Sequence, residues 1–460
     1  MPPSKHDTTL VEGSVRDSLI RMTTPMIIGM LMMFTFSLVD TLFISFLGTE
    51  PLTAISFTFP VAFTVLSMAI GLGIGTSAVV GKYLGRGDVE RAREAATVIN
   101  YISLALASLL VALCWLFLDD IFGLLGASPE LIVLIREFMA VWLPGSLLLV
   151  CMMTGNAILR ANGNTRTPSM LMAAAGFGNA ALDPLLIFGP GPFPALGIAG
   201  AAWATVISWG LVVAYLYRLL IFDLDFVGRR PPSRDALRTS GGEMLRIGIP
   251  AAGANMMTPL AAGVMTAIAA GFGNNAVAAL GVGGRIEPIA TLLILALSTS
   301  LPPLVSQNFG ANRVDRVVEA YRLSIRFVLV WQLLVYALLA LAAPLIAGVF
   351  SDDPEVTATI RLFLWIMPLG FGMQGVIILT NSSLNALHRP MSALWLSIAR
   401  FFVFYVPLAW IGSVYFGLWG FFAGAVAGNL LMGLISLTTF NRAVNDELRL
   451  QALDAAGTSG

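Results

Sequence analysis

The sequence predicts an all-α membrane protein with twelve transmembrane helices in two pseudo-symmetric six-helix lobes. Three observations predict it: an apolar composition, twelve apolar segments long enough to span a membrane, and an internal repeat. Of the 460 residues, 57% are hydrophobic and only 11% are charged, whereas a soluble domain is about 25% charged. So few charges would not keep a soluble protein dispersed, so the chain is expected to lie in a membrane.

A membrane-spanning helix needs roughly 20 mostly apolar residues. Reading along the chain, we predict spans at 20–47, 53–81, 96–118, 131–156, 168–189, 196–222, 245–272, 276–304, 320–349, 357–384, 391–412 and 418–441. The one longer polar stretch, 223–244, is rich in arginine and separates two groups of six spans. The predicted organisation is therefore an N-terminal lobe (1–222), a cytoplasmic linker (223–244), a C-terminal lobe (245–441) and a cytoplasmic tail (442–460).

The distribution of basic residues predicts the orientation. Cytoplasmic loops are enriched in Lys and Arg. Of the 26 basic residues, all but Arg136, Arg285, Arg361 and Arg400 lie in or beside the N-terminal tail, the linker, the C-terminal tail or every second loop. We therefore expect a multi-pass protein of the bacterial inner membrane with both termini in the cytoplasm.

The two halves of the sequence resemble each other. At an offset of 225 positions, the matching pairs are Arg21 and Arg246, Pro25 and Pro250, Gly48 and Gly273, and Asn156 and Asn381. Near the end the offset becomes 220, where Gly197 aligns with Gly417. Each half has six spans, an even number, so both halves share one orientation. Parallel repeats with a substrate site at their interface are a known transporter plan.

The candidates for charges near mid-bilayer are Asp40, Asp183, Glu287, Arg285 and Arg400. A charge at mid-bilayer costs about 2.5–3.5 kcal/mol or more on insertion scales. Each is therefore a candidate functional residue.

Four polar residues of the N-terminal lobe fall at a common depth. Asp40 lies about 10 Å from the outer end of its span, at about 1.5 Å per residue, and Asp183 and Thr205 lie at similar depths. Asn179 shares a helix face with Asp183 because it precedes it by four residues. All four offer oxygen ligands of the kind that hard cations select. Two neighbouring carboxylates in low dielectric cannot both ionise easily, so one is expected to hold a proton unless a cation intervenes. The alternative is a set of purely structural hydrogen bonds.

The C-terminal lobe lacks this acidic pair, since Asp40 maps to Met265 and Asp183 maps near Tyr405. It has Glu287 and Arg400 instead. We predict a structural or gating ion pair between them, because each charge alone would be expensive in the membrane.

Flexible methionines and flat aromatic rings suit varied organic cations. Met33, Phe36, Phe138 and Met172 are candidates for lining a substrate cleft, although most such residues are ordinary packing. Asn156, at the inner end of its span, is the better polar candidate.

Several function classes are disfavoured. The net charge is zero, which argues against nucleic-acid binding. We find no nucleophile–base pair, metal-ligand cluster or nucleotide-binding loop, so the chain is not expected to be an enzyme or to need a cofactor. Any pumping must draw on an ion gradient.

Three segments resemble the multidrug and toxic compound extrusion (MATE) transporters. They are Pro25 with Ser37-Leu38-Val39-Asp40-Thr41, Asn179-Ala180-Ala181-Leu182-Asp183-Pro184, and Gly81-Lys82-Tyr83-Leu84-Gly85-Arg86-Gly87-Asp88. The resemblance covers nearly the whole chain and looks closest to the DinF-like branch, which has an aspartate pair in the N-terminal lobe. The acids that the NorM-like branch carries on its seventh and tenth spans are missing here.

The resemblance implies an antiporter that exports cationic, often aromatic drugs in exchange for H⁺ or Na⁺. It implies that Asp40, Asn179, Asp183 and Thr205 form the proton or Na⁺ site. It also implies that the first helix bends at Pro25, and that Asn156 lies near the substrate cavity. The expected partners are small organic cations and membrane lipid, and the expected state is a monomer.

Three alternatives remain. A major-facilitator carrier also has two six-span halves, but its loop signature is matched only loosely by Gly85-Arg86-Gly87-Asp88. A flippase for lipid-linked or polysaccharide precursors would line its cleft with basic residues, which the N-terminal half lacks at mid-span. A membrane-embedded enzyme would need catalytic groups that we do not find.

Overall fold

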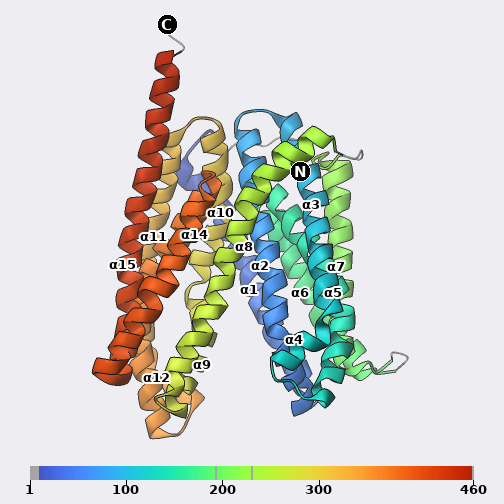
Figure 1. Ribbon diagram of the computed structural model, residues 1–460, viewed down its shortest axis with the longest axis vertical. Coiled ribbons are helices and arrows are strands. Elements are labelled where there is room, and N and C mark those ends of the chain that lie inside the picture. The colour runs from blue at the N-terminus through green and yellow to red at the C-terminus, as the bar shows by residue number, and fades with distance from the viewer. Residues whose placement is uncertain (1–9, 192–193, 229–231, 458–460) are drawn as a thin grey trace. The chain divides into compact units, whose positions relative to one another are not determined.

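The computed structural model describes residues 10–191, 194–228 and 232–457. Every regular element in these ranges is helical (Figure 1), which confirms the predicted all-α class. Lys5 of the predicted N-terminal tail and Arg229 and Arg230 of the predicted linker lie outside the described ranges.

The helices of the first half are α1 (Val15–Ser45), α2 (Thr49–Gly85), α3 (Val89–Leu116), α4 (Leu118–Leu124), α5 (Pro129–Ala161), α6 (Arg166–Phe188) and α7 (Gly197–Arg218), which continues into the π-helical η1 (Leu219–Asp223). Those of the second half are α8 (Arg234–Ala270), α9 (Asn274–Ala290), α10 (Leu292–Gly310), α11 (Val314–Phe350), α12 (Pro354–Ile366), the 3₁₀ turn η2 (Met367–Gly370), α13 (Phe371–Ala386), α14 (Pro390–Ile398), the π-helical η3 (Ala399–Tyr405) and α15 (Val406–Gly457).

The described chain contains twelve candidate membrane spans by length and composition. Eleven of its helical segments are long and apolar enough to span a membrane. The last of these, Pro390–Leu453, is interrupted at Gly417, where φ is 62° and ψ is −146°. Glycine adopts this conformation without steric cost. The segment therefore contributes two spans, and the prediction of twelve is confirmed.

The internal repeat is visible in the backbone. Four pairs of positions related by the sequence offsets have a positive φ: Gly48 and Gly273 (110° and 95°), Gly87 and Asn312 (77° and 58°), Gly163 and His388 (80° and 58°), and Gly197 and Gly417 (54° and 62°). Positive φ is uncommon outside glycine, and Asn and His tolerate it better than most residues. The two halves therefore turn in the same way at equivalent places.

The chain divides into two compact units. The first contains Arg21–Ala252, and the second contains Leu10–Ile20 together with Gly253–Gly460. Helices α1 and α8 each begin in one unit and end in the other. Because α8 starts at Arg234, the stretch 223–244, expected to be a linker, is helical over its second half.

The core of the first unit is built from α2, α3, α5 and α7. Helix α5 packs against α2, α3 and α7, and α6 packs against α7 (Figure 1). Leu72, Ile99, Ile158 and Leu216 are buried in this core.

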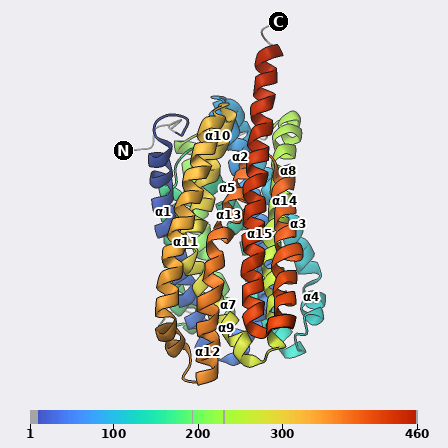
Figure 2. The same ribbon diagram turned by 90° about the vertical axis from the view of Figure 1, so that its left-hand side faces the viewer.

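In the second unit, α13 packs against α10, α11 and α15 (Figure 2). This unit also holds the segment from Leu10 to Gly13 through the buried Arg316. Its guanidinium donates to the Gly13 carbonyl at 2.7 Å and to the Asn308 amide oxygen at 2.8 Å. Asn308 in turn donates to the Leu10 carbonyl at 2.9 Å.

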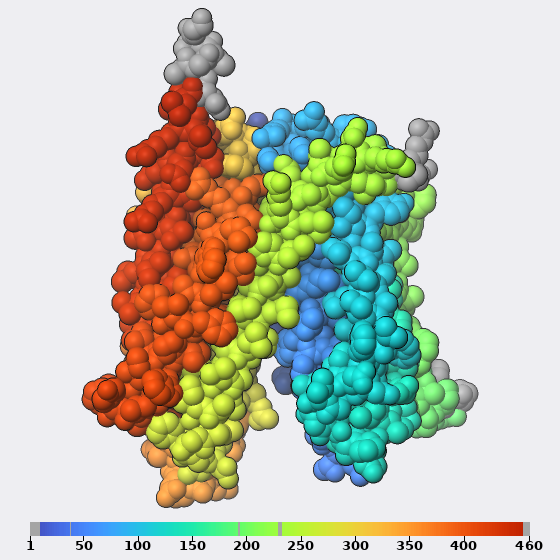
Figure 3. Space-filling model, viewed as in Figure 1, coloured from blue at the N-terminus to red at the C-terminus, as the bar shows by residue number. Residues whose placement is uncertain are grey.

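Large apolar side chains cover the outside of the second unit. Trp395, Trp410, Tyr415 and Trp419 are all exposed. They belong to α14 and the first half of α15, whose orange-to-red surface faces the viewer in Figure 3. Exposed apolar surface of this extent is unfavourable in water and suits the hydrocarbon of a bilayer.

Candidate functional site

Helix α6 contacts α1 at three points spaced seven residues apart. Ser169 donates a hydrogen bond to the Pro25 carbonyl. At Gly176 the helices approach so closely that an added Cβ would lie 2.4 Å from Cδ2 of Phe36. The third point is Asp183. Seven residues make about two helical turns, so one face of α6 follows α1 from Pro25 towards Asp40.

Asp183 lies at the centre of a small polar cluster. It is fully buried, with 0% of its surface exposed. The side-chain amide of Asn179, one turn earlier in α6, donates to the Asp183 carboxylate at 3.3 Å and to the Thr205 hydroxyl at 3.1 Å. Thr205, on α7, donates to the Ala201 carbonyl at 3.1 Å. Asn179 therefore links two helices of the first unit.

Asp40 joins this cluster from α1. Its carboxyl lies within hydrogen-bonding reach of the Asp183 carboxyl. Oδ1 of Asp40 and Oδ2 of Asp183 are buried and receive no hydrogen bond from a described residue. Buried carboxylate oxygens without a donor are unfavourable. A proton shared by this acidic pair, Asp40 and Asp183, or a cation between them would remove that penalty.

The donor set suits H⁺ or Na⁺ better than a transition metal. The described chain holds no group of three His, Cys, Asp or Glu side chains that could bind a metal ion. The acidic pair with the Asn179 and Thr205 oxygens provides hard oxygen ligands. The four residues that the sequence analysis placed at one depth thus lie together.

The candidate cleft residues lie in different surroundings. Asn156 is buried, with 1% exposed, and its Oδ1 receives no hydrogen bond from a described residue. Phe36 packs edge-on against Phe177, with ring centroids 6.1 Å apart. Phe138 packs in an apolar cluster with Ile135.

Met33 is exposed and Met172 is half-buried. Phe36 and Phe138 both pack against neighbouring side chains, so the structure favours Asn156, whose buried Oδ1 receives no hydrogen bond from a described residue.

The ion pair predicted between Glu287 and Arg400 is not formed. The Glu287 carboxylate accepts a hydrogen bond from the Gln374 amide at 2.7 Å. Nε of Arg400 donates to the Asn429 amide oxygen at 3.2 Å. Each charge is bonded to an amide rather than to the other charge, because the amides of α13 and α15 lie nearer. Neither Gln374 nor Asn429 could be predicted from the sequence, since a neutral amide in a span gives no signal of its own.

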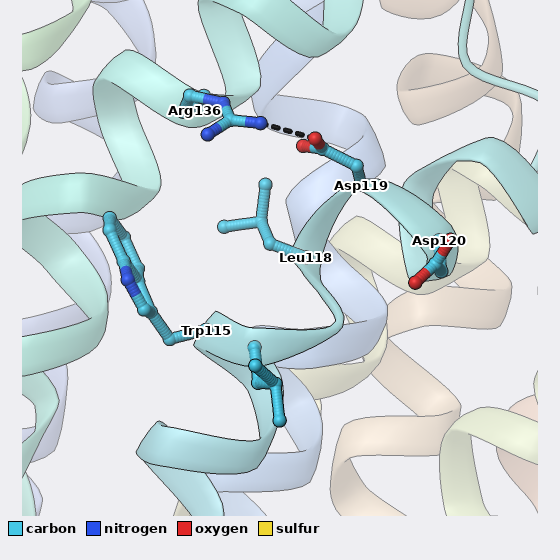
Figure 4. A pocket seen from close by; sticks show the side chains of 6 residues that line it. Trp115, Leu118, Asp119, Asp120 and Arg136 are labelled. Atoms are coloured by element: carbon cyan, nitrogen blue, oxygen red, sulfur yellow. Dashed lines mark hydrogen bonds and ion pairs between the residues drawn. The ribbon is translucent and has the colours of Figure 1, made fainter.

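A pocket of about 270 Å³ lies elsewhere, around α4. Figure 4 shows Arg136 reaching across it to Asp119, with which it forms an ion pair, while Asp120 points away. This pocket is formed by the ends of helices and shares no residue with the acidic pair.

Comparisons with known proteins all match transporters or export proteins. The family model described as MatE matches residues 25–185 and 250–411. The chain is 40% identical over 425 residues to a FAD transporter of Shewanella oneidensis, covering 92% of this chain and 94% of that protein. It is 26% identical over 418 residues to the multidrug export protein MepA of Staphylococcus aureus, covering 89% and 90%.

Solved structures agree with the sequence relatives. The MATE transporter VcmN of Vibrio cholerae in its bent form matches with a TM-score of 0.90 and 32% identity, over 94% of this chain and 98% of that one. A MOP superfamily transporter of Pyrococcus furiosus matches with a TM-score of 0.88 and 26% identity, over 96% and 98%.

Proposed function

We infer that this chain, which belongs to the MATE family of membrane transporters, is a secondary active exporter that exchanges aromatic organic compounds for H⁺ or Na⁺. Membership of the family makes it a multi-pass transporter of small molecules and not an enzyme. The direction of transport, the exchanged ion and the residues that couple the two are our proposal.

The observation that carries this proposal is the acidic pair. Asp40 and Asp183 bring two carboxyl groups together on α1 and α6, and each keeps one buried oxygen without a donor. Intramembrane acids that face each other are expensive unless they bind something. In this proposal they hold a proton or Na⁺ in one state and release it in another.

The contacts along α1 and α6 suggest how occupancy changes the structure. With the acidic pair neutralised, α1 packs on α6 at Ser169, Gly176 and Asp183. Loss of the ion leaves two negative charges in contact, which repel. Pro25 cannot donate a helical hydrogen bond, so α1 is weakest there. We propose that α1 moves about Pro25 when the ion leaves.

We propose the bacterial inner membrane as the location, with both termini in the cytoplasm and a monomer as the working unit. The support is the placement of Lys and Arg in alternate loops, which follows the positive-inside rule.

Two substrate classes are supported by relatives. The 40% identical relative is a FAD transporter, and the 26% identical relative is a multidrug export protein. We propose flavin-like aromatic compounds as the first class to test, because the higher identity extends over 92% of the chain. Cationic aromatic drugs are the second class, and a flippase for lipid-linked precursors remains the alternative.

The proposal is tested by efflux from everted vesicles under separately imposed H⁺ and Na⁺ gradients. FAD and a fluorescent cationic dye serve as substrates. The wild type should export at least one of them under one gradient, and Asp40→Asn should abolish that dependence. Asp120→Asn is the matched control, because Asp120 is an exposed acid outside the cluster.

Full gradient-driven efflux by Asp40→Asn would end the coupling proposal. Export that ignores both gradients would remove the antiporter and favour the flippase alternative.

A further inference from the structure

Arg400 has an unusual setting for a charged residue in a span. It lies near the middle of the eleventh span, in the π-helical stretch η3, and only 8% of its surface is exposed. π-helical turns are rare and are frequently found at functional sites. The guanidinium carbon lies 4.6 Å from the centroid of the Phe401 ring. The site therefore holds a cation in an apolar, aromatic environment.

Close packing of two spans positions the one hydrogen-bond partner of Arg400. A Cβ added to Gly428 would lie 2.8 Å from Cα of Tyr405, so α15 approaches η3 with no side chain between them. The next residue, Asn429, is 3% exposed and accepts from Nε of Arg400 at 3.2 Å. The approach at Gly428 therefore fixes Asn429 beside the guanidinium.

No described carboxylate forms an ion pair with Arg400. Glu287 accepts a hydrogen bond from Gln374 instead. Within the described chain, Nε is the only nitrogen of Arg400 that donates to a protein group. A buried cation without a close counter-charge is costly. The two terminal nitrogens of the guanidinium thus remain available for an anion.

We propose that Arg400, supported by Asn429, forms an anion-binding subsite in the C-terminal lobe that takes the phosphate or pyrophosphate of an aromatic substrate. The planar guanidinium can donate two parallel hydrogen bonds to a phosphate. This inference rests on the proposed transport of aromatic compounds, and it adds that the transported compound carries a negatively charged phosphate. Flavin nucleotides have this chemistry, and cationic drugs do not.

The position within the repeat supports the assignment. At an offset of 222, Asn179 and Asp183 of the first unit correspond to Phe401 and Tyr405. Arg400 therefore lies at the level in its lobe that the acidic pair occupies in the other. At this offset Arg400 itself corresponds to Gly178, so its charge is an addition of the C-terminal lobe and not a replacement for one of the acids.

The test compares riboflavin, which carries no phosphate, with its monophosphate FMN and with FAD. Binding is measured by flavin fluorescence anisotropy on the purified full chain in nanodiscs of uncharged phosphatidylcholine, without any gradient. The wild type should bind FMN and FAD more tightly than riboflavin. In Arg400→Gln that preference should fall by about 10- to 100-fold, as expected for charge-assisted hydrogen bonds, and riboflavin binding should be unchanged.

Three further variants sharpen the result. Arg400→Lys keeps the charge and should retain part of the preference. Asn429→Asp places a carboxylate beside Arg400. The resulting ion pair should abolish the preference for phosphorylated flavins while leaving the protein folded. Arg361→Gln is the control, because Arg361 is a C-lobe arginine whose guanidinium donates to the Thr357 carbonyl within its own helix.

A wild type without preference for the phosphorylated flavins would overturn the inference, as would a preference that survives Arg400→Gln. Preference that disappears in nanodiscs containing phosphatidylglycerol would assign the subsite to a lipid headgroup and also overturn it. Because binding at equilibrium needs no gradient, these outcomes are distinct from failure of the coupled transport proposed above.

Discussion

Asp40 and Asp183 have different surroundings although they touch each other. Asp183 is fully buried and receives a hydrogen bond from Asn179. Asp40 is only partly buried, and its Oδ1 receives no hydrogen bond from a described residue. A proton or cation bound there is held by both carboxyl groups at once. Its affinity is therefore a property of the pair rather than of either residue.

Asn179 is the residue that holds the cluster together, because its amide bonds both Asp183 and Thr205. Asn179→Ala removes both bonds, and we expect efflux to fall about tenfold or more, since a hydrogen bond to a charged group contributes about 1.5–3 kcal/mol. Initial efflux rates in everted vesicles measure this. Ser208→Ala is the control, because Ser208 bonds only the Ala204 carbonyl of its own helix. Equal rates for the two variants would contradict the role given to Asn179.

At the scale of elements, α1 and α6 are joined along a line of small and polar contacts. The approach at Gly176 leaves no space for a side chain opposite Phe36. The same approach brings Asp183 to Asp40, so packing of the two helices and formation of the acidic pair depend on each other.

Gly176→Ala should therefore weaken both packing and transport. Overpacking of this kind costs about 1–3 kcal/mol, and we expect a lower midpoint of thermal unfolding together with slower efflux. Gly210→Ala provides the comparison, since a Cβ there would lie 3.7 Å from its nearest neighbour, Cδ1 of Leu148. If both variants unfold at the same temperature as the wild type, the α1–α6 contact is looser than described.

Arg316 gives a second prediction at this scale. It binds the Leu10, Glu12 and Gly13 carbonyls and so holds this short segment within the second unit. Arg316→Ala should lower the unfolding midpoint and expose the segment before α1 to protease. Its repeat equivalent, Arg91, is largely exposed and pairs with Asp88 one turn away, so Arg91→Ala should change neither property. Equal protection of the segment in both variants would argue against this role.

At the scale of the whole molecule, the sequence predicts the helices and their repeat better than it predicts the hydrogen-bond partners of the buried charges. The twelve spans follow from hydropathy, and the repeat follows from glycines such as Gly48 and Gly273 whose φ angles are both positive. The depth argument also placed Asp40 and Asp183 together. In contrast, the predicted Glu287–Arg400 pair is wrong. Which amide reaches each charge depends on the rotation of the helices, and the π-helical turns of η3 change that rotation locally.

The central claim is that the acidic pair binds the coupling ion, and ion release on substrate binding tests it most directly. Purified protein in lightly buffered solution is mixed with FAD or a cationic dye, while a pH indicator and radioactive sodium report the released ion. The wild type should release H⁺ or Na⁺ on substrate addition, whereas Asp40→Asn and Asp183→Asn should release neither. Release from both variants equal to that of the wild type would contradict the account.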